Sequence, residues 1–132
     1  MAECLFCGIV AGEIPSKQVY ADDDSIAFLD ISPWQEGHTL VIPRRHVADV
    51  LSDDEVIVAT APAVVAVGNL VKRRLGASAC NILSNAGADS GQEVFHAHVH
   101  VIPRYAERPG ISHMRGTVTR DLETVHRLLT RS

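Results

Sequence analysis

The sequence has no long run of basic residues and no excess of positive charge. Its 12 Lys and Arg residues are outnumbered by 16 Asp and Glu residues, which gives a formal net charge of −4. A protein that binds duplex nucleic acid usually presents a basic face to the phosphates, and no basic cluster here is long enough to form one. We therefore expect no nucleic-acid partner.

The sequence also lacks long apolar runs and the pattern of an N-terminal export signal. No apolar stretch approaches the roughly 18 residues that would span a bilayer. Residues 1–4 (MAEC) have neither the basic nor the apolar region of a signal peptide. The sequence therefore predicts a cytoplasmic protein without membrane association.

Cysteine is scarce, with three residues in the chain. Cys4 and Cys7 form a Cys-x-x-Cys pair, whereas Cys80 lies in an apolar run and is expected in the core. In a reducing compartment such a pair indicates metal binding or redox chemistry before a structural disulfide. A redox pair usually begins a helix that follows a strand, and no strand is predicted before Cys4. Metal binding is therefore favoured over a redox dithiol or two unrelated thiols.

The remaining pattern fits one α+β domain over residues 1–132, because a chain of this length with 46% hydrophobic residues can bury one core. Strands are predicted at 17–21, 25–30, 38–42, 79–84 and 94–103, and helices at 6–11, 52–75 and 120–131. Ser52 and Glu55 resemble a capping box at the start of the long helix, and Pro62 is expected to kink or split that helix near Thr60. The pattern predicts an antiparallel sheet with one principal helix and a short N-terminal helix.

Three histidines alternate along the last predicted strand. Because side chains alternate between the faces of a strand, His96, His98 and His100 are expected on one side, about 6.6 Å from one to the next. The residues between them are apolar and suit packing on a core. Imidazoles at this density favour either a metal site or nucleophilic catalysis over a merely exposed polar face.

The loop before this strand helps to choose between the two chemistries. Asn85, Gly87, Gly91 and Gln92 offer amide donors and close backbone approach, which a phosphate oxygen requires. A catalytic metal site would more often add carboxylate ligands, and the predicted strand has none. These residues favour a histidine that attacks phosphorus, although alone they could simply build a loop.

The His-x-His-x-His row followed by two apolar residues resembles the motif of the histidine triad (HIT) family of nucleotide hydrolases and transferases. The similarity covers about residues 4–104, and the stretch after Arg104 shows no clear family motif. Further segments that resemble the family, in the expected order, are 28–33 (FLDISP), 37–43 (GHTLVIP), 45–46 (RH), 85–87 (NAG) and 91–95 (GQEVF). Several motifs in register are more specific than one short pattern. The resemblance implies a HIT-like fold and a homodimer.

The resemblance also implies roles for individual histidines. His98 matches the nucleophile that forms a covalent nucleotidyl-histidine. His100 matches a residue that holds the phosphate oxygens and assists proton transfer. His38 and His96 match histidines that orient the nucleophile.

The substrate would be a purine nucleotide derivative bound by residues on both sides of the triad. Asp30 matches the acid that accepts hydrogen bonds from the ribose hydroxyls, and Phe6 and Ile31 would help to enclose the base. Asn85, Gly91 and Glu93 fall on phosphate-loop positions. At Glu93 the backbone N–H is expected to matter more than the carboxylate, because a negative charge would repel a phosphate.

The Cys-x-x-Cys pair needs two further ligands to hold zinc. His46 and His96 are the candidates, since bacterial members of the family resemble this arrangement. Two thiolates and two imidazoles would complete a closed tetrahedral, structural site. The leading hypothesis is thus a hydrolase of a phosphoramidate, adenylate or dinucleoside polyphosphate. The alternatives are a nucleotide-binding module with little turnover, or a zinc protein whose histidines are all ligands.

Overall fold

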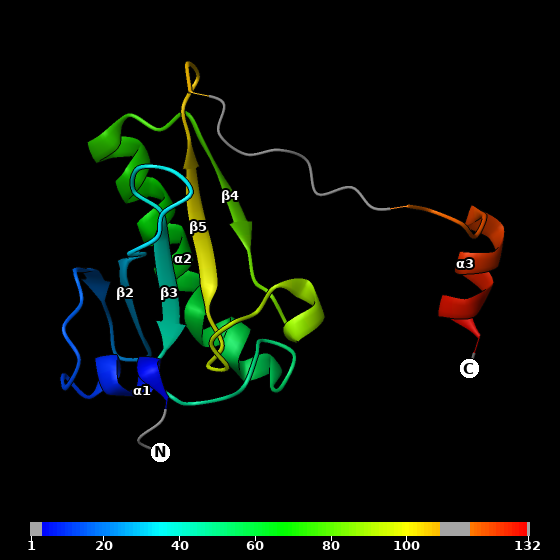
Figure 1. The fold of residues 1–132 in the computed structure, drawn as a ribbon, viewed down its shortest axis with the longest axis horizontal. Coiled ribbons are helices and arrows are strands. Elements are labelled where there is room, and N and C mark those ends of the chain that lie inside the picture. The colour runs from blue at the N-terminus through cyan, green and yellow to red at the C-terminus, as the bar shows by residue number, and fades with distance from the viewer. Residues whose placement is uncertain (1–3, 109–116, 132) are drawn as a thin grey trace.

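The computed structural model describes residues 4–108 and 117–131, and its centre is a five-stranded antiparallel sheet (Figure 1). The strands are β1 (Gln18–Ala21), β2 (Ser25–Leu29), β3 (Thr39–Pro43), β4 (Ala79–Leu83) and β5 (Val99–Arg104), in the order β1-β2-β3-β5-β4. The helices are α1 (Leu5–Val10), α2 (Asp54–Leu75), α3 (Leu122–Thr130) and a single 3₁₀ turn, η1 (Ala88–Ser90). The predicted α+β class with an antiparallel sheet is confirmed.

The sheet separates two small cores. Alternate residues of the central strands point to opposite faces, so Ile26, Phe28 and Leu40 meet Phe6 and Ile9 of α1 on one side. On the other side Ala27, Val41 and Val101 pack against Ala63 and Val67 of α2. The α1 face is only partly covered, and this leaves room for a cavity.

Helix α2 begins and ends at residues suited to each position. Asp53, rather than the expected Ser52, caps the N-terminus by accepting the backbone N–H of Glu55. Gly76 ends the helix in the left-handed conformation. The predicted split at Pro62 does not occur, since the helix is continuous, and the predicted kink stays a prediction. Pro62 and Val58, whose carbonyl Pro62 cannot bond, are both exposed, so that carbonyl can meet water.

By length and composition alone, α2 would qualify as a membrane span, so the expectation that no stretch approaches this length was too strict. Core helices pass the same test. One face of α2, formed by Val56, Thr60, Ala63, Val67 and Val71, is buried on the sheet. The helix is therefore placed here as the core helix of the fold.

Strand β5 is shorter than predicted. It begins at Val99, so His96 and His98 precede it and only His100 lies on it. The backbone N–H of Ala97 donates to the carbonyl of Val47 instead of to a strand partner. His98 and His100 both line one cavity, with ring centroids 5.1 Å apart, whereas His96 lies with Cys4, Cys7 and His46.

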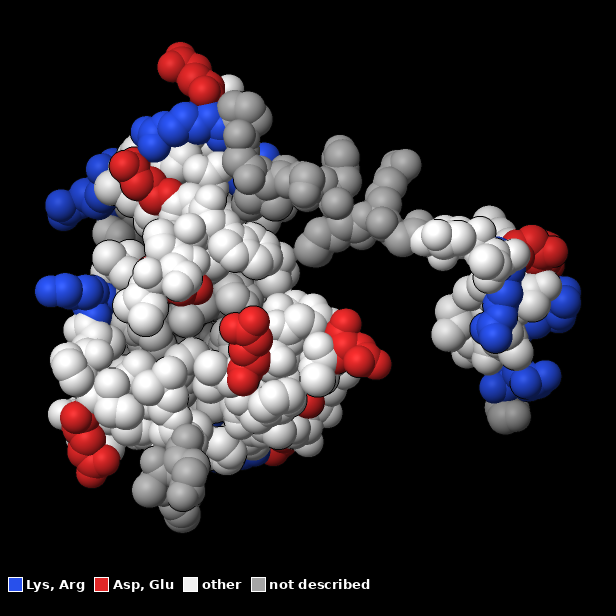
Figure 2. Space-filling view, viewed as in Figure 1, with Lys and Arg blue, Asp and Glu red and all other residues white. Residues whose placement is uncertain are grey.

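Helix α3 buries none of its residues. Figure 1 shows it apart from the body that contains the sheet. Figure 2 shows basic side chains at the upper and left edges of the body and on α3, and acidic side chains spread over the body, so the viewed face carries no continuous basic surface.

Candidate functional site

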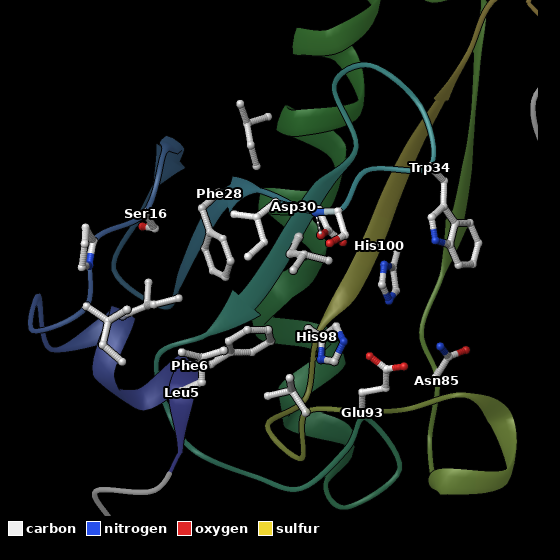
Figure 3. Close-up of a pocket in the computed structure, with 18 of the residues that line it drawn as sticks. Leu5, Phe6, Ser16, Phe28, Asp30, Trp34, Asn85, Glu93, His98 and His100 are labelled. Atoms are coloured by element: carbon white, nitrogen blue, oxygen red, sulfur yellow. Dashed lines mark hydrogen bonds between the residues drawn. The ribbon is translucent and has the colours of Figure 1, made fainter.

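A cavity of about 450 Å³ opens on the α1 face of the sheet. Figure 3 shows Phe6 and Phe28 at one end and Trp34, Asn85 and Glu93 at the other. The apolar wall is made by Leu5, Phe6, Ile9, Ile14, Phe28 and Leu40, and the polar lining includes Ser16, Asp30, Asn85, Glu93, His98 and His100. An apolar slot that ends in a few convergent polar groups is typical of a small-molecule site.

His98 lies between the two ends of the cavity. Its Nδ1 is 2.8 Å from the backbone carbonyl of His96, so Nδ1 carries the proton and donates to that oxygen. The hydroxyl of Ser84 donates to the backbone carbonyl of His98, which holds the segment in place. In this tautomer the lone pair is on Nε2, the nitrogen that can act on a ligand in the cavity.

His38 and His100 form a directed hydrogen-bonded pair. The backbone N–H of Trp34 donates to His38 Nδ1 at 3.1 Å, so the proton of neutral His38 resides on Nε2. That N–H donates to His100 Nδ1, 2.9 Å away. His100 must then carry its own proton on Nε2, which leaves one N–H donor for the cavity.

Burial keeps both members of this pair neutral near pH 7. Burial lowers the pKa of His38 from its ordinary 6.5, against the opposing effect of the nearby Asp30 carboxylate. Burial, together with the neighbouring His98 and His38, lowers the pKa of His100 from 6.5 to about 4. His100 thus offers its Nε2–H to the cavity as a neutral hydrogen-bond donor.

Asp30 follows β2 directly and lines the cavity. One carboxylate oxygen accepts the backbone N–H of Ser32 at 2.8 Å. The other lies 3.6 Å from His38 Nε2. These two contacts fix the carboxylate at the rim while part of it stays open to a ligand.

The loop before the histidines is shaped by Gly91 and Gln92. Gly91 adopts a φ of +105°, a conformation that favours glycine. Gln92 was predicted to bind substrate, but its side chain is buried and does not line the cavity. Its amide accepts the N–H of Gly87 and donates to the carbonyls of Ala48 and Val94, so its polar atoms hold the loop instead.

A second cluster lies at the start of α1 and joins Cys4, Cys7, His46 and His96. The sulfur-to-nitrogen distances run from 3.3 to 3.6 Å, and the Nδ1 atoms of the two histidines are 3.2 Å apart. Usual zinc bond lengths in a tetrahedron give edges of about 3.6 Å for S–N and about 3.3 Å for N–N. The four donors therefore fit one zinc ion.

The orientation of His96 also suits a metal ligand. Its Nε2 lies 2.9 Å from the backbone carbonyl of Pro43 and donates to it, which directs the Nδ1 lone pair at the cysteines. Burial and the neighbouring Cys4 raise the pKa of the Cys7 thiol. A bound cation would reverse that effect by stabilising both thiolates.

The structure separates histidines that the sequence placed together. His38 was expected to orient His98, but its hydrogen bond is to His100. His96 contacts His98 through its backbone carbonyl, and its ring faces the cysteines. Ile31 lines the cavity mouth with 95% of its side chain exposed.

Trp34 lines the cavity and was not predicted. Its ring stacks on His100 with an interplanar angle of 16° and meets His38 edge-on. The position could have been noticed, because the only tryptophan of the chain stands between Asp30 and His38. Its orientation depends on the folded loop, which no local pattern reveals.

Comparisons with known proteins agree on one family. A model of the HIT domain matches residues 11–107. The crystal structure of a HIT family member from Bacillus subtilis has a TM-score of 0.86 at 37% identity and covers 97% of this chain and 93% of that one. A zinc-bound histidine triad family protein from Mycobacterium smegmatis has a TM-score of 0.73 at 36% identity and covers 97% and 91%. An adenylylsulfatase of Arabidopsis thaliana is 37% identical over 103 residues, which are 77% of this chain and 52% of that protein.

Proposed function

This chain belongs to the HIT family, and on that premise we propose that it is a hydrolase of purine nucleoside monophosphate derivatives, with His98 as the covalent nucleophile. The observation that carries the proposal is the hydrogen bond from His98 Nδ1 to the His96 carbonyl, because it presents the Nε2 lone pair to the cavity. The adenylylsulfatase among the relatives supports hydrolytic chemistry on a nucleotide in this family.

The nucleotide would lie along the cavity from its apolar to its polar end. Phe6 and Ile31 would enclose the base, and Asp30 would accept hydrogen bonds from the ribose hydroxyls. The Nε2–H of His100, Asn85 and the backbone around Gly91 would hold the phosphate oxygens. All of these residues line the same cavity. Glu93 lines it too, and there we assign the backbone N–H rather than the carboxylate to the phosphate.

Hydrolysis would proceed in two displacements. In the first, His98 Nε2 attacks phosphorus, an N–P bond forms, and the bond from phosphorus to the leaving group breaks with its electron pair. A water molecule at the open mouth gives the leaving group a proton. In the second, the resulting hydroxide attacks phosphorus, the N–P bond breaks and the lone pair returns to His98. The products are a nucleoside monophosphate and the protonated leaving group.

His98 and His100 would assist these two displacements differently. Once the N–P bond forms, the His98 ring carries a positive charge, which the His96 carbonyl stabilises through the Nδ1 proton. His100, held neutral by burial and oriented by His38, would donate to a phosphoryl oxygen as charge develops there. His100 is thus assigned to hold phosphate rather than to supply the proton.

The hypothesis that every histidine is a metal ligand fits less well. Two groups of metal-ligand type occur among the described residues, and His98 belongs to neither. In the second group, Asp30, His38 and His100, a hydrogen bond between the two histidine nitrogens, 2.9 Å apart, accounts for their contact without an ion. A binding module without turnover is the remaining alternative, and only activity separates it from a hydrolase.

Turnover on a small substrate panel tests the proposal. Adenosine phosphoramidates, acyl adenylates and dinucleoside polyphosphates should include at least one substrate that releases AMP. His98→Ala should abolish that release and still bind AMP, because binding uses many other contacts. His126→Ala, an exposed histidine of α3, is the matched control. Turnover of His98→Ala near the wild-type rate would refute the mechanism.

We also propose that Cys4, Cys7, His46 and His96 hold a structural zinc ion. The tetrahedral spacing of the four donors and the zinc-bound relative support this assignment. A closed site of two thiolates and two imidazoles has no open position for substrate. The metal would tie the start of the chain to the segment before β5 and leave His98 free for chemistry.

A homodimer is the proposed assembly. The outer face of α2 exposes Ile57, Val58 and Val65, and the edge strand β4 exposes Ile82. Exposed apolar side chains and an unpaired strand edge both suit a self-complementary contact. Light scattering should report twice the chain mass, and Val65→Asp should shift the protein toward monomer. A wild-type monomer would contradict this assembly.

A further inference from the structure

Four rings follow one another along the cavity, and Trp34 is the last of them. The ring of Phe6 lies 5.1 Å from that of His98, His98 lies 5.1 Å from His100, and His100 lies 6.2 Å from Trp34. Figure 3 shows Trp34 beyond His100 on the side away from Phe6. The proposed function gives a role to the rings of Phe6, His98 and His100. It gives none to the ring of Trp34.

The loop that carries Trp34 is held firmly. The backbone N–H of Trp34 donates to His38 Nδ1. On the same loop the Glu36 carbonyl accepts the hydroxyl of Tyr105, and the side chain of Gln35 donates to the carbonyl of Arg108. These contacts fix the backbone around Trp34 without using its indole.

The indole is stacked against His100 yet remains 50% exposed at the cavity. A large apolar ring left half open inside a cavity is a ready surface for a ligand, because covering it removes more apolar area from water. The stack on His100 also limits the rotation of the ring. Trp34 is therefore an ordered aromatic platform at the polar end of the site.

The order of the rings indicates what would cover Trp34. The base occupies the Phe6 end and phosphorus lies at His98 and His100. In a displacement at phosphorus the leaving group departs roughly opposite the nucleophile. The side of phosphorus away from His98 is the end where Trp34 lies.

We propose that Trp34 is the specificity-determining residue for the leaving group and favours one that carries an aromatic ring near the scissile bond. This inference rests on the proposed function, since it takes His98 as the nucleophile. Stacking of two aromatic rings is worth enough to change selectivity about two- to tenfold. Trp34 takes no part in bond making or breaking.

Two adenosine phosphoramidates test the inference, one of 2-phenylethylamine and one of 2-cyclohexylethylamine. The two leaving groups match closely in size and basicity and differ in aromaticity. The wild type should prefer the aromatic substrate in kcat/KM. Trp34→Ala should lower the aromatic-to-aliphatic ratio about two- to tenfold, and Trp34→Phe should keep most of it. Leu51→Ala, an exposed apolar side chain that does not line the cavity, is the control and should leave the ratio unchanged.

The aromatic-to-aliphatic ratio of kcat/KM distinguishes recognition of the leaving group by Trp34 from a purely structural role of Trp34. If Trp34 only supported the loop, Trp34→Ala would slow both substrates equally and the ratio would stay at the wild-type value. That result would overturn the inference. Trp34→Phe guards against a folding defect in the alanine variant.

A binding measurement separates this inference from the proposed function. In the His98→Ala background, calorimetry gives the affinity for each intact phosphoramidate without turnover. The Trp34→Ala change should again lower the aromatic-to-aliphatic affinity ratio. If the wild type hydrolyses neither compound but this ratio falls, the hydrolase proposal fails and the role of Trp34 stands. If the ratio does not change, or neither compound binds, the role of Trp34 is refuted.

Discussion

The ring of Phe6 meets the imidazole of His98 edge to face, with centroids 5.1 Å apart and planes at 84°. Phe6 lies between Cys4 and Cys7 in the sequence and belongs to α1. Cys7 lies in this helix and Cys4 caps its N-terminus, so the segment that supplies two donors of the metal cluster also supplies a wall of the nucleotide cavity. Metal binding and nucleotide binding are therefore expected to be coupled.

Removing the metal should weaken AMP binding, because α1 would no longer be tied to His46 and His96 and Phe6 would lose its fixed place. Coupling between two sites is reciprocal, and a change of about fivefold or more is typical. Calorimetry on metal-loaded and chelator-treated protein measures it directly. Phe6→Ala should keep the metal and abolish the coupling. Equal AMP affinities in the two wild-type samples would contradict the link.

Asp30→Ala should weaken AMP binding by roughly tenfold or more, because two ribose hydroxyls would lose a charged hydrogen-bond acceptor. A 2′,3′-dideoxy analogue has no such hydroxyls and should lose little affinity. Asp30→Asn keeps the acceptor for the Ser32 N–H and serves as the control for loop structure. If both ligands weakened equally on Asp30→Ala, the carboxylate would be acting only on the fold.

Protein purified without a tag should contain about one zinc ion per chain. At free zinc about 100 times the dissociation constant, chelation should lower the melting temperature by about 10 °C. The double variant Cys4→Ser, Cys7→Ser should lose both the metal and this stabilisation. Cys80→Ala lies outside the cluster and should keep the metal. A metal-free wild type of full stability would exclude the site.

Acid should destabilise the protein partly through His100. Its pKa is lowered from 6.5 to about 4 in the folded chain, so between these pH values the unfolded chain binds a proton that the folded chain does not. The free energy of unfolding should therefore fall as pH drops from 6.5 to 4. The groups that set this pKa besides burial are His98, His38 and Asp30.

Urea denaturation across that pH range measures the effect. His100→Asn removes the titrating group and should flatten the fall relative to the wild type. Metal loss on acidification affects both proteins. The difference between their free energies of unfolding at each pH therefore reports the contribution of His100. Parallel curves would show that His100 does not titrate abnormally.

The sequence predicts the sheet and the principal helix well because local patterns carry that information. The strands predicted at 17–21 and 25–30 are separated by three aspartates, a polar turn, and the structure pairs β1 with β2 on either side of it. The predicted start of β5 at residue 94 was wrong. The alternating pattern continues through the histidines, but the backbone N–H of Ala97 donates to the carbonyl of Val47, a residue remote in sequence, and the strand begins only at Val99. Long-range hydrogen bonds of this kind have no local sequence pattern.

The candidate site also divides into residues that a sequence motif predicts and residues whose place depends on the folded chain. Family resemblance named the four cluster residues that the structure brings together. The amide of Gln92 looked like a phosphate donor, but three backbone partners use it. Trp34 had no motif to mark it, and only the folded loop shows its stack on His100.

The central claim is that His98 carries the nucleotide during turnover, and its most direct test is rapid acid- or base-quench during the hydrolysis of an adenosine phosphoramidate. Digestion and mass spectrometry of the quenched protein should find one AMP on the peptide that contains His98. The adduct should form and decay at rates consistent with kcat, and it should be absent from His98→Ala. Release of AMP from the wild type with no adduct at any time, or an adduct on another residue, would contradict the account.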